Sequence, residues 1–125
     1  MEEQEILNIE TGTKEIITIE PKPVKIVKIE VQLVGEKKNK KAVFEVKHPD
    51  KEETIHISAV KYEKKGSLEF SGTWINLDEE NKLRKGSATA NLLAFFNVKS
   101  LKEFEGKENI PTIQDEKGYL CFKTY

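Results

Sequence analysis

Cysteine is almost missing from this 125-residue chain, since Cys121 is the only one. A single cysteine cannot form an internal disulfide, which excludes the disulfide framework of a small extracellular domain and favours a reducing, cytoplasmic setting. The two histidines, His48 and His56, fall on opposite faces of the strands predicted below, so they cannot complete the three or four converging ligands of a zinc site. We therefore expect no metal and no cofactor.

Long apolar runs are missing as well. No stretch approaches the roughly 18 residues that a membrane-spanning helix requires, and residues 1–5 are acidic where a signal peptide would be basic. We expect a soluble protein without a membrane partner. A chain of 125 residues with 37% hydrophobic content is large enough for a single domain, residues 1–125, with one core.

Arginine is nearly missing too, because Arg84 is the only one, whereas lysine and glutamate dominate the 34% of residues that are charged. This composition resembles that of thermophilic proteins, in which ion-pair networks gain value at high temperature. The formal net charge of −1 excludes a nucleic-acid binder that is basic over its whole surface. It leaves room for a local basic patch.

Strand patterning is strongest in residues 42–77, where three apolar runs alternate with a period of two. Phe44 and Val46 share one face of the first run, and Ile57 and Ala59 share one face of the second. Aligning the apolar faces predicts that Val46 pairs with Ile57 and that Phe44 pairs with Ala59. The three runs together predict a β-meander.

The third run, residues 68–77, contains an irregularity. If Leu68 and Phe70 point inward, Ile75 has the wrong parity, and a bulge at residues 72–73 would absorb the slip. Trp74 would then leave the core. Without a bulge Trp74 stays in the core with Leu68 and Phe70, which is the usual place for a large aromatic side chain.

The remaining elements surround this meander. Ile-rich segments beginning at residues 5, 15 and 25 each resemble a strand, and residues 1–12 are expected as a mobile edge strand. Ser87 is a candidate N-cap for a helix carrying Leu92 and Phe96, and Ser100 with Glu103 matches a capping box. A hairpin around residues 114–118 ends the chain. The expected fold is mainly β (α+β): an antiparallel β-meander or small OB-like barrel covered by one main helix near the C-terminus.

Catalytic motifs are not evident, and we expect no enzyme. His56 and Ser58 lie on a strand without the turn that a nucleophile needs, and the acids at 78–80 resemble a solvated loop. The helix start offers one weaker candidate, a phosphate site made by Arg84, Lys85 and Ser87. That run lacks P-loop spacing, so a plainly capped helix is the alternative.

Lysine-rich hairpin loops give the most specific functional hypothesis. In an up-and-down meander alternate loops fall at the same end, where these lysines would track the backbone of single-stranded DNA or RNA while exposed aromatics stack on bases. The candidate nucleic-acid-binding residues are Lys37, Lys38, Lys40, Lys41, Lys61, Tyr62, Lys64, Lys65 and Trp74.

The alternative hypothesis is a structural or protein-interaction domain that forms a homo-oligomer, most simply a homodimer, through edge strands or through the helix with Phe95 and Phe96. Lysines in hairpin loops would then serve only to keep a β-protein soluble. Exposure of Trp74 and Tyr62 distinguishes the two hypotheses.

Overall fold

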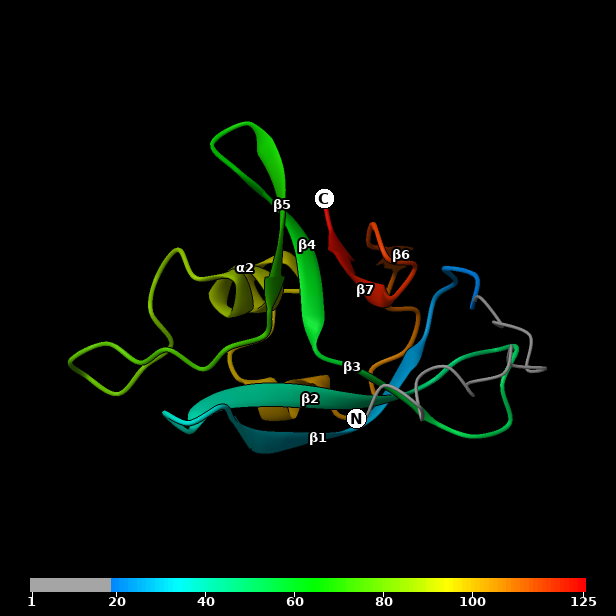
Figure 1. Cartoon of the computed structure of the whole chain (residues 1–125), viewed down its shortest axis with the longest axis horizontal. Coiled ribbons are helices and arrows are strands. Elements are labelled where there is room, and N and C mark those ends of the chain that lie inside the picture. The colour runs from blue at the N-terminus through cyan, green and yellow to red at the C-terminus, as the bar shows by residue number, and fades with distance from the viewer. Residues whose placement is uncertain (1–18) are drawn as a thin grey trace, which may run out of the picture.

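The computed structural model describes residues 19–125, which form two β-sheets, one α-helix and one short 3₁₀ helix (Figure 1). The predicted mainly β architecture is confirmed. Of the three Ile-rich N-terminal segments, the third becomes strand β1, whereas the first two fall almost entirely on residues 1–18 and lie outside the described residues. Within the described residues, no helix is long and apolar enough to cross a membrane.

The first sheet contains β1 (Lys25–Val34), β2 (Asn39–Lys47) and β3 (Ile55–Ile57) in that order. Phe44 pairs with Ile57 and Val46 with Ile55, so the predicted faces are correct but the predicted register is wrong by two residues. A shift of two keeps every side chain on its face, which alternation alone cannot detect. Ala59 does not pair with Phe44, because it already belongs to the second sheet, opposite Gly72.

The second sheet has the order β5-β4-β7-β6 and combines β4 (Ala59–Lys64), β5 (Ser67–Gly72), β6 (Thr112–Gln114) and β7 (Leu120–Thr124). The predicted C-terminal hairpin is confirmed as the antiparallel pair of β6 and β7. The predicted single meander over residues 42–77 is not formed, because its strands are divided between the two sheets; the pairing is mainly antiparallel, and β7 pairs parallel to β4. The two sheets are not closed into a barrel.

Thr73 connects the two sheets. Its backbone N–H donates to the Ser58 carbonyl at 3.0 Å, while its own carbonyl accepts from the Ala42 N–H at 2.9 Å. The Thr73 hydroxyl, which is fully buried, also donates to the Ala42 carbonyl at 2.5 Å. The chain therefore leaves β5 after Gly72 and continues along β2, where Trp74 bridges Lys41.

The predicted bulge at residues 72–73 is absent, since β4 and β5 pair through Gly72 without a change of register. Alternation continues unbroken: Thr73 is buried and Ile75 packs against the core, whereas Phe70 is 41% exposed. Placing Leu68 and Phe70 in the core was wrong. Trp74 lies outside the core as the bulge hypothesis expected, but for a different reason, because it shares the outward parity of Phe70.

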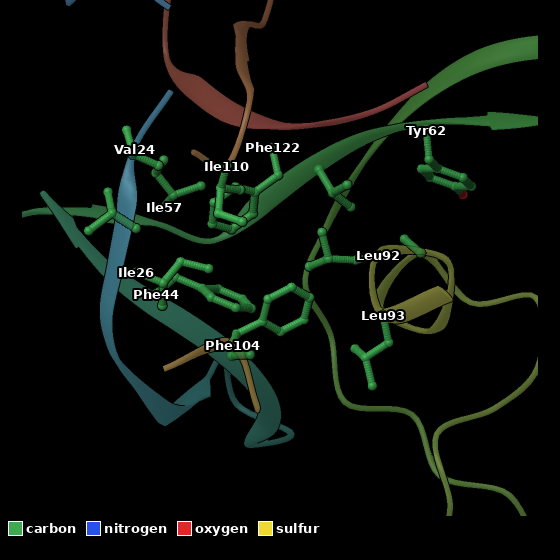
Figure 2. Packing of buried hydrophobic residues seen from close by; sticks show 14 residues of the cluster. Val24, Ile26, Phe44, Ile57, Tyr62, Leu92, Leu93, Phe104, Ile110 and Phe122 are labelled. Carbon is green, nitrogen blue, oxygen red and sulfur yellow. The ribbon is translucent and has the colours of Figure 1, made fainter. Parts of the chain in front are cut away.

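The core lies between the sheets and is built around three aromatic rings (Figure 2). Phe44 contacts Phe122 edge to face at a centroid distance of 4.9 Å and Phe104 at 5.9 Å. Phe104 belongs to the 3₁₀ helix η1 (Leu101–Phe104) beneath β1. Edge-to-face aromatic pairs add directional contacts to the area that they bury.

Helix α2 (Ala88–Phe95) closes the core with Leu92, which is 1% exposed. The predicted N-cap is confirmed, because the Ser87 hydroxyl accepts from the Ala90 N–H at 3.1 Å. The predicted capping box before η1 is not formed. The Ser100 side chain makes no capping bond, and the Glu103 carboxylate accepts from the Lys99 N–H instead of the Ser100 N–H.

Candidate nucleic-acid interface

The predicted lysines divide between the two sheets. Lys37 and Lys38 lie at the β1–β2 turn, whereas Lys64 and Lys65 lie at the β4–β5 turn, and these hairpins project from different parts of the molecule (Figure 1). The expectation of one lysine-bordered end is therefore wrong. The prediction failed because the chain passes from the first sheet to the second between β3 and β4. Alternate loops lie at the same end only when all strands belong to one meander.

Tyr62 was predicted to stack on bases, and the structure places it in the core with 7% of its surface exposed. Val60 and Tyr62 point inward on β4, and Figure 2 shows the Tyr62 ring beside α2. The hydroxyl donates to the Glu69 carboxylate at 3.4 Å. Burial, together with this nearby carboxylate, raises the pKa of the phenol. Tyr62 is thus a packing residue.

Trp74 and Lys41 meet on the outer side of the three-stranded sheet. The Lys41 ammonium lies 4.9 Å from the centroid of the half-buried indole. Gly72 makes room for this pair, because a Cβ atom there would stand 2.8 Å from the Trp74 Nε1 atom. The structure therefore brings one lysine and one aromatic of the predicted set into contact, on the hairpin that also carries Lys37, Lys38 and Lys40.

A richer aromatic and cationic surface lies on the outer side of the four-stranded sheet. Lys61 on β4 pairs with Phe70 on β5 and with Lys123 on β7, so these three side chains form a row across the sheet. The Lys61 ammonium lies 4.8 Å from the Phe70 centroid and 5.7 Å from the Tyr125 centroid. The Lys123 ammonium lies 5.0 Å from the Tyr125 centroid. We call Lys61, Phe70, Lys123 and Tyr125 the aromatic face.

Tyr119 extends the aromatic face toward the β6–β7 turn. It is 69% exposed, and with Phe70 and the turn residues 115–117 it lines a shallow depression of about 420 Å³. The turn is held by the Asp115 carboxylate, which accepts from the Lys117 and Tyr119 N–H groups at 2.9 Å each. Phe70 on edge strand β5 and the residues of the β6–β7 turn therefore line the same exposed surface.

The electrostatic balance around the aromatic face is mixed. Lys64 and Lys65 lie at the tip of the adjacent hairpin, while Glu63 and Glu116 are exposed near the same side of the sheet. Ammonium groups positioned over aromatic rings are attracted by the ring electrons, by about 0.5–1 kcal/mol at exposed sites. With lysines and glutamates both near the face, contacts to an anionic ligand with planar groups should be modest in strength and sensitive to salt.

The candidate phosphate site at the start of α2 lacks support. Arg84 and Lys85 line a depression that the carboxylates of residues 78–80 share, and this local negative charge opposes an anion. The Ser87 hydroxyl already caps the helix. Backbone N–H groups of Lys82 and Glu80 lower the pKa of the Asp78 carboxyl, which favours its charged form.

The two histidines lie on opposite faces as predicted, with His48 buried and His56 exposed. The His48 Nε2 atom is 2.7 Å from the Glu20 carbonyl, and its Nδ1 atom accepts from the Asp50 N–H at 3.0 Å. These bonds suit a neutral ring protonated on Nε2. Across residues 19–125, no three His, Cys, Asp or Glu side chains are grouped so that they could hold a metal ion.

Comparisons with known protein families, with characterised proteins and with solved structures give no match. The aromatic face is the surface on which side chains of complementary chemistry are most clearly assembled. Sequence reasoning identified Lys61 but missed Phe70, Lys123 and Tyr125, because Phe70 was assigned to the core and the parallel pairing of β7 with β4 was not foreseen.

Proposed function

We propose that this protein is a small non-catalytic module that binds single-stranded nucleic acid without sequence preference through its aromatic face. The observation that carries the proposal is the position of Lys61 over both Phe70 and Tyr125 on an open sheet surface. Exposed rings on a sheet can stack on bases, and ammonium groups beside them can contact phosphates. The base and the phosphate of one nucleotide would each contact a side chain in this row.

A single strand suits this face better than a duplex. A base that stacks on Phe70 or Tyr125 would replace the ammonium that lies over the ring, and only bases that are free of their neighbours in a helix can stack in this way. A duplex exposes base edges and phosphates instead, and reading base edges needs an element that enters a groove. Because ring stacking accepts every base, we expect little sequence preference.

The Lys41 and Trp74 pair forms a second contact surface in this proposal, with Lys37, Lys38 and Lys40 on the same hairpin. Lys41 lies on β2 in the other sheet, whereas Trp74 follows the end of β5, which carries Phe70. An OB-like closure of the two sheets stays a prediction from the sequence. Binding at the aromatic face does not depend on it.

Self-association through β1 is the second candidate function. Val31 and Leu33 on this edge strand are 55% and 60% exposed, which is unusual for large aliphatic side chains in a row. The start of the strand is already covered, because Ile26 bonds to Lys107 and Gly106. A homodimer would therefore have to use the other half of β1, near Val31 and Leu33.

Binding of a fluorescein-labelled oligothymidine at low salt, followed by fluorescence anisotropy, tests the main proposal. Replacing Phe70 or Tyr125 by alanine should weaken binding by about 1–3 kcal/mol each. Phe95→Ala is the matched control, because Phe95 is a somewhat more exposed aromatic, at 49% against 41% and 38%, on α2 outside the aromatic face. No binding to the wild-type protein, or equal losses in all three variants, would leave self-association as the better function.

A further inference from the structure

An apolar groove lies beside α2, away from the aromatic face. It has a volume of about 720 Å³, within the range of about 300–1,000 Å³ typical of ligand sites. Its walls come from three parts of the chain: the segment around residues 75–83, one side of α2 and the connection into η1. The aliphatic side chains that define it are Ile75, Leu77, Leu83, Leu93, Val98 and Leu101.

The two longest uncharged stretches of the sequence meet at this groove. Residues 86–98 form a run of 13 without a charge and residues 70–77 a run of 8, in a chain in which 34% of residues are charged. A surface helix normally carries charged side chains on its outward side. Helix α2 carries none, and Ala94, which lines the groove, is exposed. This side of α2 therefore has the uncharged composition that is typical of a surface in contact with another part of a protein.

The charged side chains that line the groove have one sign, and the acidic turn of residues 78–80 lies next to Lys82. Among the residues that line it in the described structure, Lys82 and Lys99 are the only charged ones. Lys82 makes one long contact of 4.0 Å with Glu80, and both side chains are more than three-quarters exposed, so this pair is weak. Two cations at the border of an aliphatic groove complement a ligand that combines apolar groups with carboxylates.

We propose that this groove binds an acidic, amphipathic peptide segment of a partner protein, with aliphatic or aromatic side chains in the groove and carboxylates at Lys82 and Lys99. Nucleic acid is a poor ligand here, because the lining contains no aromatic ring on which a base could stack. Recognition of amphipathic segments in apolar grooves is a common mode of peptide binding. The proposal does not depend on nucleic-acid binding at the other surface.

Selection from a displayed library of random peptides tests this proposal. The full chain serves as the target, and the Ala94→Arg variant serves as the counter-target, since an arginine at this exposed helical position fills the groove without disturbing the core. Enriched peptides should combine large apolar residues with aspartate or glutamate. Their binding to Ala94→Arg should be at least tenfold weaker.

Charge reversal provides a second variant. Lys82→Glu combined with Lys99→Glu should weaken binding of the selected peptides at least tenfold, whereas Lys65→Glu on the β4–β5 hairpin should leave it unchanged. Absence of enrichment, neutral or basic selected sequences, or equal binding to Ala94→Arg would overturn the proposal. A dimer in sedimentation that Ala94→Arg dissociates would also overturn it, and would identify a second copy of the chain as the occupant.

Discussion

The Lys61 ammonium lies 4.8 Å from the centre of the Phe70 ring, and the two residues stand directly opposite each other on β4 and β5. Cross-strand neighbours on one face of a sheet are close enough to interact without any movement of the backbone. Phe70 is 41% exposed, with this ammonium over its ring. A second cation–ring contact joins Lys123 of β7 to Tyr125, two residues further along the same segment, with 5.0 Å between ammonium and centroid.

The salt dependence of binding should report how many lysines contact phosphates. Replacing Lys61 or Lys123 by glutamine should reduce the slope of log K against log salt concentration by about 0.7 each, the value expected for one phosphate contact on a single strand. Lys102→Gln, at an exposed position on η1, is the control. Anisotropy titrations at several salt concentrations measure the slopes, and slopes equal to wild type in both variants would exclude these contacts.

Leu92 should be a major source of stability. It is 1% exposed and joins α2 to the core, so Leu92→Ala removes buried methyl groups and leaves a cavity that costs about 2–5 kcal/mol. Phe95→Ala on the same helix should cost much less, because the Phe95 ring is 49% exposed. Urea denaturation measures both. A loss below about 1 kcal/mol for Leu92→Ala would contradict the placement of α2 against the core.

Thr73 should stabilise the junction between the sheets through its hydroxyl group. Thr73→Val keeps the shape but removes the donor to the buried Ala42 carbonyl, with an expected cost of about 1–3 kcal/mol. Thr73→Ser keeps the donor and loses only a methyl group. Thermal denaturation should therefore rank wild type above Thr73→Ser and Thr73→Ser above Thr73→Val; the reverse order of the two variants would show that packing outweighs the hydrogen bond.

Cys121 should resist alkylation in the folded protein. Burial raises the pKa of its thiol to about 11, so little reactive thiolate exists near pH 8. Iodoacetamide should modify the folded chain slowly and the urea-unfolded chain rapidly, as mass spectrometry can show. Rapid modification of the folded protein would contradict the burial of the side chain.

The same shift predicts a dependence of stability on pH. Because the folded pKa lies above the ordinary value of 9.0, the contribution of the thiol to stability is present below pH 9 and is lost as the pH rises toward about 11. Cys121→Ala should lack this part of the alkaline loss. Denaturation of both proteins between pH 8 and 11 compares them directly.

Local patterns predicted elements better than their assembly. The helix cap at Ser87, the C-terminal hairpin and the inward faces of Phe44 and Val46 all follow from spacing within a few residues. The pairing of β4 with β7 does not follow from such spacing, because the paired residues, such as Val60 and Phe122, are 62 positions apart and the two strands run parallel. A single sequence contains no local signal for such a pairing, and register shifts of two residues leave the pattern unchanged.

The error at Phe70 decided which site residues were missed. Leu68 and Phe70 were assigned to the core because large apolar side chains are usually buried. The opposite parity of Thr73 and Ile75 was the available signal: continuous alternation with these two residues inward places Phe70 and Trp74 outward, as observed. To choose between an inward and an outward Phe70, one would need to know that Thr73 is buried between the two sheets. The presence of a threonine in a strand does not indicate whether it is buried.

Amide chemical shifts of the isotope-labelled protein, recorded during addition of oligothymidine at low salt, test the central claim most directly. Binding at the aromatic face predicts the largest shifts at Lys61, Phe70, Lys123 and Tyr125, with little change along α2. Shifts confined to the β1–β2 hairpin, or no shifts at all, would contradict the claim that the outer side of the four-stranded sheet binds single-stranded nucleic acid.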